Sequence, residues 1–158
     1  MKKCIFAGTF DPITRGHEAL IGQCLRLFDE VVVAILKNPA KQPMFSLQQR
    51  KEMIRIACKN DARVRVIDFE GTVADLLKKE GTPFYVRGIR NTVDFEYENA
   101  NYFASVRLNP DMVPIYLPCP QELLHISSSM VRSSLQFKTP ISDYVSEEVE
   151  RYIIGCQG

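Results

Sequence analysis

Continuous apolar stretches alternate with amphipathic ones along the chain. Residues 31–35 are all apolar, which is typical of a strand buried on both faces of a parallel sheet. Residues 18–28 instead repeat their apolar side chains at helical spacing, so they predict an amphipathic helix. Over the whole sequence, these patterns predict strands at about 3–7, 30–36, 64–69, 83–87 and 113–117, and helices at about 18–28, 46–59, 72–81, 92–108, 127–135 and 146–154.

Two of these helices carry clear end signals. Ser46 followed three residues later by Gln49 is a capping box, in which each side chain bonds the other residue's backbone amide. Gly81 stands at the usual position of a glycine just beyond a helix C-terminus. We therefore place the boundaries of these helices at Ser46 and Gly81.

The alternation of strands and helices predicts an α/β fold with a parallel sheet and right-handed crossovers. Five strands suggest a doubly wound, Rossmann-like sheet of order 3-2-1-4-5, followed by C-terminal helices. No internal repeat or linker interrupts the pattern, so we expect residues 1–158 to form one domain. In this order strands one and four are neighbours, and the chain reverses direction between them. Ligands bind at such a switch point, beyond the carboxyl ends of the strands.

The two most polar turns of the chain follow strands one and four. Residues 8–17 contain glycines, hydroxyls and a histidine, and lead into a helix whose N-terminus can face an anion. Arg87 and Arg90 flank Gly88, and two guanidinium groups beside a glycine can chelate phosphate. The alternative is that both arginines form surface ion pairs with Asp94 and Glu96. Their place at the switch point favours phosphate binding.

Two further segments belong to the same end of the predicted sheet. Lys41 lies in the loop after strand two, where a solvated lysine is the commonest outcome. Ser127, Ser128 and Ser129 open the helix after strand five. A serine N-cap is expected for any helix, but three serines at a helix start also make a good anion site.

Composition and charge limit the possible functions. The net charge of +1 gives no basic surplus for broad nucleic-acid binding. We expect no signal peptide and no membrane association, because no apolar run reaches transmembrane length. The five cysteines are scattered and include no C-x-x-C pair, which favours reduced thiols in the cytoplasm and argues against a zinc site. The chain is expected to supply no metal ligands of its own.

Four separated segments, in order, resemble motifs of the phosphopantetheine adenylyltransferase family within the nucleotidyltransferase superfamily. They are G-T-F-D-P-I-T-R-G-H at 8–17, K-Q-P-M-F at 41–45, R-G-I-R-N-T-V-D-F-E-Y-E at 87–98 and I-S-S-S-M-V-R at 126–132. The resemblance implies transfer of AMP from ATP to 4'-phosphopantetheine, which gives dephospho-coenzyme A and pyrophosphate. It also implies Mg²⁺ bound with the nucleotide, a homohexamer, and inhibition by coenzyme A.

The resemblance also implies roles for individual residues. Both substrates are polyanions, so the task is alignment and charge neutralisation during an in-line attack without a covalent intermediate. The sequence departs from the family pattern at Ala7, near Leu123 and at Ser105, where proline, an aromatic residue and asparagine are usual. The implied catalytic residues are His17, Thr9, Lys41 and Arg90. The implied phosphopantetheine-binding residues are Thr9, Lys41, Val73 and Arg87. The implied ATP-binding residues are Thr9, Phe10, His17, Gly88, Ile89, Arg90, Glu98, Leu123, Leu124, His125, Ile126, Ser127, Ser128 and Ser129.

Two alternative functions stay open at this point. A sister nucleotidyltransferase would act on nicotinate mononucleotide or a phospho-alcohol, but those relatives usually carry histidine where this chain has Thr14. A noncatalytic nucleotide-binding module would need a phosphate cradle, but not Thr9, Lys41 and His17 together. A class I aminoacyl-tRNA synthetase is not expected, because 158 residues leave no room for an anticodon-binding region.

Overall fold

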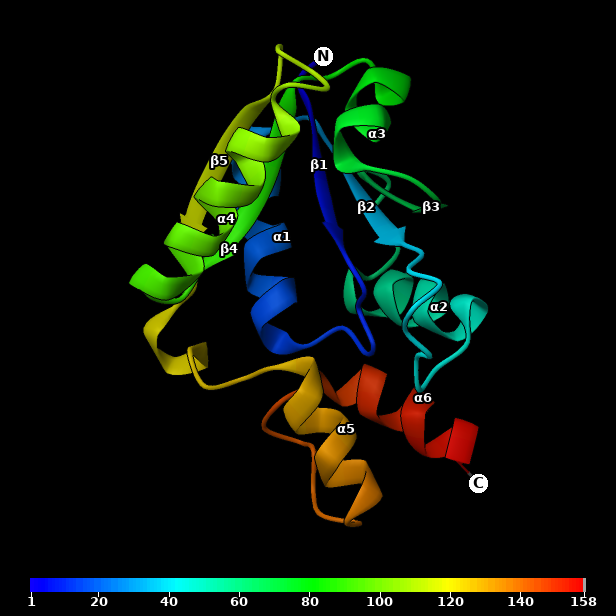
Figure 1. Ribbon diagram of the computed structural model, residues 1–158. Coiled ribbons are helices and arrows are strands. Elements are labelled where there is room, and N and C mark those ends of the chain that lie inside the picture. The colour runs from blue at the N-terminus through cyan, green and yellow to red at the C-terminus, as the bar shows by residue number, and fades with distance from the viewer. Residues whose placement is uncertain (158) are drawn as a thin grey trace.

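A single five-stranded parallel sheet forms the centre of the computed structural model, which describes residues 1–157 (Figure 1). Its strand order is β3-β2-β1-β4-β5, as the sequence predicts. The central strands β1 and β2 are fully apolar where they are buried, because both faces of a parallel sheet are covered by helices. The strands are β1 (Lys3–Gly8), β2 (Glu30–Leu36), β3 (Val64–Phe69), β4 (Phe84–Ile89) and β5 (Val113–Pro118).

Helices cover both faces of the sheet and one end of it (Figure 1). One core contains residues of α1, α2, α5 and α6 packed against the sheet, and the core on the other face contains residues of α3 and Tyr102 of α4. The last two helices lie beyond the carboxyl ends of the strands, at the bottom of Figure 1. The helices are α1 (Arg15–Leu27), α2 (Leu47–Ala57), α3 (Val73–Glu80), α4 (Thr92–Ser105), the short 3-10 helix η1 (Gln121–Leu123), α5 (Ser128–Gln136) and α6 (Glu147–Gln157).

The sheet opens between β1 and β4. Six residue pairs join β1 to β2, but only Ile5 with Tyr85 and Phe6 with Val86 join β1 to β4. Beyond Phe6 and Val86 the two strands diverge, as Figure 1 shows. The switch point of the topology is therefore also a physical gap at the carboxyl ends of the strands.

The helix boundaries confirm the two capping signals and correct one prediction. Ser46 and Gln49 make the expected reciprocal bonds, and Gly81 ends α3 in the left-handed region with φ 69°. The prediction that α1 begins near Glu18 is wrong, because α1 begins at Arg15. Thr14 is its N-cap and His17 completes a second capping box, so the end of the polar turn is the first turn of the helix. The long helix also ends earlier than predicted, at Ser105.

The approach of α1 to the sheet depends on Gly88. A Cβ atom built on Gly88 would overlap Cδ1 of Leu20 and would lie 3.4 Å from Sγ of Cys119. Leu20 is 5% exposed and lies one helical turn after His17. The missing side chain at position 88 therefore sets how closely the helix that carries His17 can pack on β4.

This contact predicts the outcome of a double-mutant cycle. Gly88→Ala should lower the free energy of unfolding by about 1–3 kcal/mol through overpacking, and Leu20→Ala by about 2–5 kcal/mol through cavity formation. In the double variant the new methyl group occupies space that Leu20 has left. The combined loss should therefore fall at least about 1 kcal/mol short of the sum of the two single losses. Urea unfolding of the four proteins measures this, and strict additivity would contradict the contact.

Candidate active site

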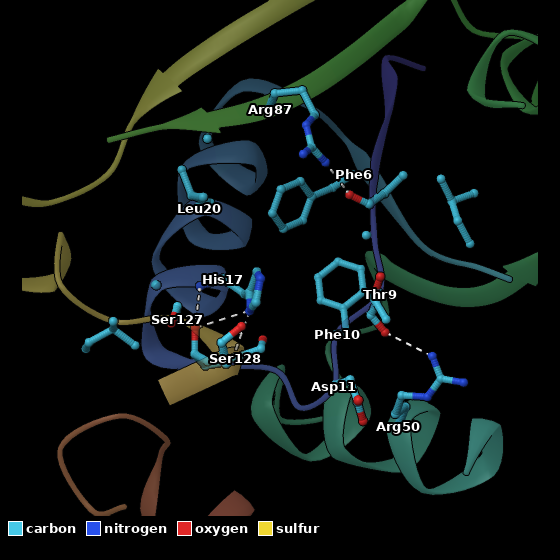
Figure 2. A pocket seen from close by; sticks show the side chains of 18 of the residues that line it. Phe6, Thr9, Phe10, Asp11, His17, Leu20, Arg50, Arg87, Ser127 and Ser128 are labelled. Atoms are coloured by element: carbon cyan, nitrogen blue, oxygen red, sulfur yellow. Dashed lines mark hydrogen bonds between the residues drawn. The ribbon is translucent and has the colours of Figure 1, made fainter. Parts of the chain in front are cut away.

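A cavity of about 790 Å³ lies where β1 and β4 diverge (Figure 2). Its wall combines the turn after β1, the start of α1, the loop after β2, the end of β4 and the start of α5. The two polar turns that the topology predicts to be neighbours therefore meet in one place. Among the residues singled out by the sequence, those in the wall are Thr9, Phe10, His17, Lys41, Arg87, Gly88, Arg90, Glu98, Leu123, Ile126, Ser127, Ser128 and Ser129.

The wall of this cavity is positively charged, although the chain as a whole is nearly neutral. Six cationic side chains line it against three carboxylates. A cavity of this size accommodates a small-molecule ligand, and the excess of cations favours a polyanionic one. The cations are Lys37, Lys41, Arg50, Arg87, Arg90 and Arg132, and the carboxylates are Asp11, Asp94 and Glu98.

Four residues with implied binding roles lie outside the wall. Val73 is in the first turn of α3, where it packs against the core on that face of the sheet. Ile89 follows Gly88 on β4, and alternation along a strand points its side chain to the opposite face from that of residue 88. Leu124 ends the short helix η1, and the ring of His125 lies 6.4 Å from that of Tyr144. Their proposed contacts stay predictions from resemblance.

Arg87 bridges the opening between the two strands. Its Nη1 donates to the carbonyl oxygen of Ala7 on β1 at 2.8 Å. Its Nε and Nη2 donate to the two carboxylate oxygens of Glu98 on α4, at 2.9 and 2.8 Å. Glu98 is 7% exposed and the Arg87 side chain is 29% exposed, so this is a partly buried, bidentate ion pair. Arg87 is thus held in the cavity wall by β1 and α4, with its charge neutralised. These three bonds leave two of the five guanidinium N–H groups unused.

The other cations of the wall differ in their partners. Arg90 pairs with Asp94 at 3.0 Å, which is one of the ion pairs expected as an alternative to phosphate binding. The second expected partner, Glu96, is not the residue that pairs; Arg87 pairs with Glu98 instead. The hydrogen bonds from Arg90 lower the pKa of Asp94. Lys37 pairs with Asp68 at 3.0 Å. Lys41 is exposed, and within residues 1–157 no carboxylate lies within 4 Å of its ammonium group.

The backbone fixes the orientation and tautomer of His17. The amide of Thr14 donates to Nδ1 of His17 at 3.0 Å, while the amide of His17 donates to the hydroxyl of Thr14 at 3.5 Å. An Nδ1 that accepts an N–H bond carries no proton, so the neutral ring carries its proton on Nε2. The capping box thereby leaves Nε2–H as the donor available for a ligand.

Apolar and cationic neighbours keep the His17 ring neutral. The ring of Phe10 packs against it with centroids 4.9 Å apart, and Phe6 lies 6.4 Å away (Figure 2). Burial, and then the positive charges of Arg87 and Arg90, lower the pKa of His17 from 6.5 to about 4. At neutral pH His17 is therefore an uncharged hydrogen-bond donor beside two arginines.

Two helix N-termini face the cavity, but only α5 has most of its first amides available. The amides of Thr14, Arg15 and His17 at the start of α1 bond within the protein, to His17, Tyr144 and Thr14. At α5 the Ser127 hydroxyl accepts from the Met130 amide, and the Ser128 hydroxyl donates to the Pro12 carbonyl at 2.7 Å. The first-turn amides of Ser128 and Ser129 have no intrahelical partner, so the start of α5 has the geometry of a backbone anion site.

Gly8 lines the cavity, but the position that its Cβ would take is filled by another residue of the wall, Phe10. A Cβ there would lie 3.2 Å from the ring of Phe10, which folds back over the glycine. Phe10 adopts a left-handed backbone conformation with φ 50° and is 2% exposed. The glycine therefore makes room for the phenyl ring that supports His17.

Sequence reasoning missed four charged residues of the wall: Asp11, Lys37, Arg50 and Arg132. Arg132 donates to the Asp11 carbonyl at 2.8 Å and to the Ser129 hydroxyl at 3.1 Å, and it ends the I-S-S-S-M-V-R segment. Asp11 lies within the first motif. Arg50 had one signal: it occupies the buried stripe of α2 together with Met53 and Ile54. A charged residue at a core position of an amphipathic helix indicates a specific partner.

Comparison with known proteins gives the family. The sequence model of the cytidylyltransferase-like family matches residues 5–134. A phosphopantetheine adenylyltransferase of Wolinella succinogenes is 41% identical over 152 residues, which cover 96% of this chain and 94% of the relative. One from Campylobacter hominis is 42% identical over 146 residues, 92% of each chain. The chain belongs to the phosphopantetheine adenylyltransferase family. The recognition made from the four motifs is thus confirmed.

Solved structures support the fold of this family member. The nicotinic acid mononucleotide adenylyltransferase of Plasmodium falciparum, in complex with NaAD, superposes with a TM-score of 0.71 over 99% of this chain and 97% of that one. Its sequence identity is 23%, so the likeness concerns the fold alone. None of the described helices is long and apolar enough to cross a membrane.

The environment of His17 predicts its titration. Because its pKa is lower in the folded protein than in the unfolded chain, the unfolded chain binds more protons between about pH 4 and 6.5. The stabilisation by the neutral ring is complete above that window and is lost as the pH falls through it. In ¹⁵N–¹H spectra, the His17 ring should stay neutral and protonated on Nε2 down to pH 5, with a midpoint near 4. A midpoint near 6.5, or an Nδ1–H tautomer, would contradict the capping geometry.

Proposed function

We propose that this chain transfers the AMP group of ATP to the phosphate of 4'-phosphopantetheine, releasing pyrophosphate and dephospho-coenzyme A. The observation that carries the proposal is one cavity that combines the Nε2–H donor of His17, the amides at the start of α5 and the ammonium of Lys41, which has no carboxylate partner among residues 1–157. The relatives that span nearly the whole chain carry the name of this activity.

The two substrates would occupy different parts of the wall. We assign the acceptor phosphate to Thr9 and Lys41, with help from the free N–H groups of Arg87. We assign the phosphates of ATP to His17, Arg90 and the start of α5. An acceptor oxygen then attacks the α-phosphorus in line as pyrophosphate leaves, without a covalent intermediate. The protein contributes alignment and fixed donors rather than a nucleophile.

The carboxylates of the wall bear on how Mg²⁺ could be held. Asp11 accepts two backbone amides, Asp94 pairs with Arg90, and Glu98 pairs with Arg87. All three are engaged within the protein, so they form no ready-made cage. This supports the proposal that Mg²⁺ arrives with ATP, bound to phosphate oxygens and water, where it supplies charge neutralisation.

We also propose the hexamer implied by the resemblance, with α4 contributing to contacts between copies. Glu98 is the one buried residue of this 14-residue helix. Val93, Tyr97 and Phe103 are 70, 65 and 60% exposed. Large exposed apolar side chains on one element are typical of an interaction surface.

Two further proposals concern inhibition by coenzyme A and the cellular compartment. Coenzyme A contains both an adenylate and a pantetheine arm, so we propose that it competes for the cavity as an end-product inhibitor. All five cysteines are free thiols, which supports a reducing compartment, and we propose the cytoplasm.

Pyrophosphate release from ATP tests the function and the role of Lys41 together. We expect release with 4'-phosphopantetheine and only background release with nicotinate mononucleotide. Lys41→Ala should raise the KM for the acceptor by about tenfold to a hundredfold, because a charged contact to phosphate is lost. The Kd for ATP, measured by calorimetry, should change by less than about threefold, a difference well below 1.4 kcal/mol.

Lys37→Ala is the matched control, because it removes the same charge from the same loop. Lys37 is already paired with Asp68, so its loss should weaken acceptor binding far less. Equal losses for ATP and acceptor in Lys41→Ala would remove Lys41 from the acceptor site. Turnover of nicotinate mononucleotide instead would assign the chain to the sister activity.

His17→Ala should lower kcat by roughly 10²–10³ while the Kd for ATP changes little, because a fixed donor is most useful where charge develops in the transition state. The variant also loses one bond of the α1 capping box. Gln49→Ala removes the equivalent bond of the α2 capping box at a residue that does not itself line the cavity, and controls for the loss of such a bond in stability. A His17→Ala enzyme with unchanged kcat and hundredfold weaker ATP binding would make His17 a ground-state binding residue.

A further inference from the structure

Four hydrogen bonds join the turn after β1 to the loop after β2, two of them directly and two through Arg50 of α2. The carboxylate of Asp11 accepts from the amide of Met44 at 2.8 Å and from the amide of Phe45 at 2.9 Å. In return, Nε of Arg50 donates to the Phe45 carbonyl and its Nη1 donates to the Thr9 carbonyl, each at 3.1 Å. We call these four bonds the Asp11–Arg50 bracket; Asp11 and Arg50 are labelled in Figure 2.

Both side chains of the bracket are buried, and both bond mainly to the backbone. Asp11 is 4% exposed and Arg50 is 7% exposed. Within residues 1–157 no carboxylate lies within 4 Å of Arg50, and the nearest cation to Asp11 is Arg132, with Nη1 3.9 Å from Oδ2. Burying charged groups costs free energy unless hydrogen bonds compensate, and here those bonds all fix peptide groups of the two segments.

The segments that the bracket fixes carry two residues assigned to the acceptor. Arg50 holds the backbone of Thr9 directly, and Met44 lies three residues after Lys41. Between β2 and Met44 the amide of Lys37 still bonds to the Phe69 carbonyl of β3, but the amides of Ala40 and Lys41 bond only within the loop, to Asn38. The bracket is therefore the anchor at the far end of the loop that carries Lys41.

We propose that Asp11 and Arg50 are positioning residues for the acceptor phosphate. The bracket holds the backbone of Thr9 and the end of the Lys41 loop at a fixed spacing, so that the Thr9 hydroxyl and the Lys41 ammonium can reach the same phosphate. This inference rests on the proposed function and adds two residues to it. It also separates two sets of residues, because the bracket holds the acceptor side while His17 and α5 hold the nucleotide side.

Two variants break the bracket from opposite sides. Asp11→Asn keeps the shape of the side chain, but turns one acceptor oxygen into an NH₂ group that faces a backbone amide. It leaves the bond from Arg132 to the Asp11 carbonyl in place. Arg50→Lys keeps the charge, but an ammonium group lacks the fork that reaches two carbonyl oxygens at once. This second variant does not touch α5.

Calorimetry with 4'-phosphopantetheine and with ATP tests the inference. Each variant should weaken acceptor binding by about 10- to 100-fold, the range expected when a binding group is displaced by about 1 Å. ATP binding should change by less than about threefold, since the groups assigned above to the ATP phosphates, which are His17, Arg90 and the start of α5, make none of the four bracket bonds. In a Lys41→Ala background, Asp11→Asn should weaken acceptor binding by less than about threefold further, because the group that it positions is gone.

Hydrogen exchange of the ligand-free proteins tests whether the bracket holds the loop, independently of substrate binding. The amides of Met44 and Phe45 should exchange faster in Asp11→Asn than in the wild type, while those of β2 and β3 stay protected. If Asp11→Asn does not fold, Arg50→Lys carries the same comparison.

Three results would overturn the inference: equal weakening of ATP and acceptor, the full effect of Asp11→Asn persisting without Lys41, or faster exchange at Met44 and Phe45 with unchanged acceptor affinity. A wild-type protein that does not bind 4'-phosphopantetheine would instead defeat the proposed function, and the acceptor role of the bracket with it.

Discussion

The hydrogen bond from the Thr14 amide to Nδ1 of His17 both caps the start of α1 and fixes the imidazole that faces the cavity. The same bond satisfies an amide that α1 would leave unpaired, orients the imidazole and places its proton on Nε2. Two other contacts transmit this arrangement to the fold. Phe10 supports the ring from one side, and Leu20, one turn further along α1, rests on Gly88 of β4. The position of the donor is therefore a property of the packed core, not of a loop.

The opening between β1 and β4 sets a second constraint, because diverging strands leave backbone groups without ladder partners. Arg87 compensates by donating to the Ala7 carbonyl across the gap, and the carboxylate of Glu98 then compensates the charge of the partly buried guanidinium. The cavity thus replaces part of the sheet ladder by a side-chain network. This explains why Arg87, which the sequence predicts to be a phosphate ligand, also links β1 to α4 within the protein.

The sequence predicts the sheet order, the strands and most helix ends, since apolar patterning and capping are local signals. It predicts the wrong start for α1 although Thr14-x-x-His17 has the spacing of Ser46-x-x-Gln49, because a histidine is not among the usual capping-box acceptors. Glu98 rather than Glu96 pairs with Arg87 because tertiary packing of α4 on β4 decides which face meets the arginine. The positions of Leu124, His125 and Val73 outside the wall likewise depend on packing.

Most cations of the cavity are already held in place by other groups of the protein before any ligand binds. Glu98 neutralises Arg87, Asp94 neutralises Arg90 and Asp68 neutralises Lys37, while backbone carbonyls hold Arg50. Such partners keep each guanidinium in place, but they also reduce what it gains from a phosphate, because the charge is already compensated. Lys41 has the opposite balance: its ammonium is uncompensated among residues 1–157, and its flexible stem must be ordered on binding. Rigid anchoring of its loop lowers that entropic cost, which is the physical reason for burying two charged residues beneath it.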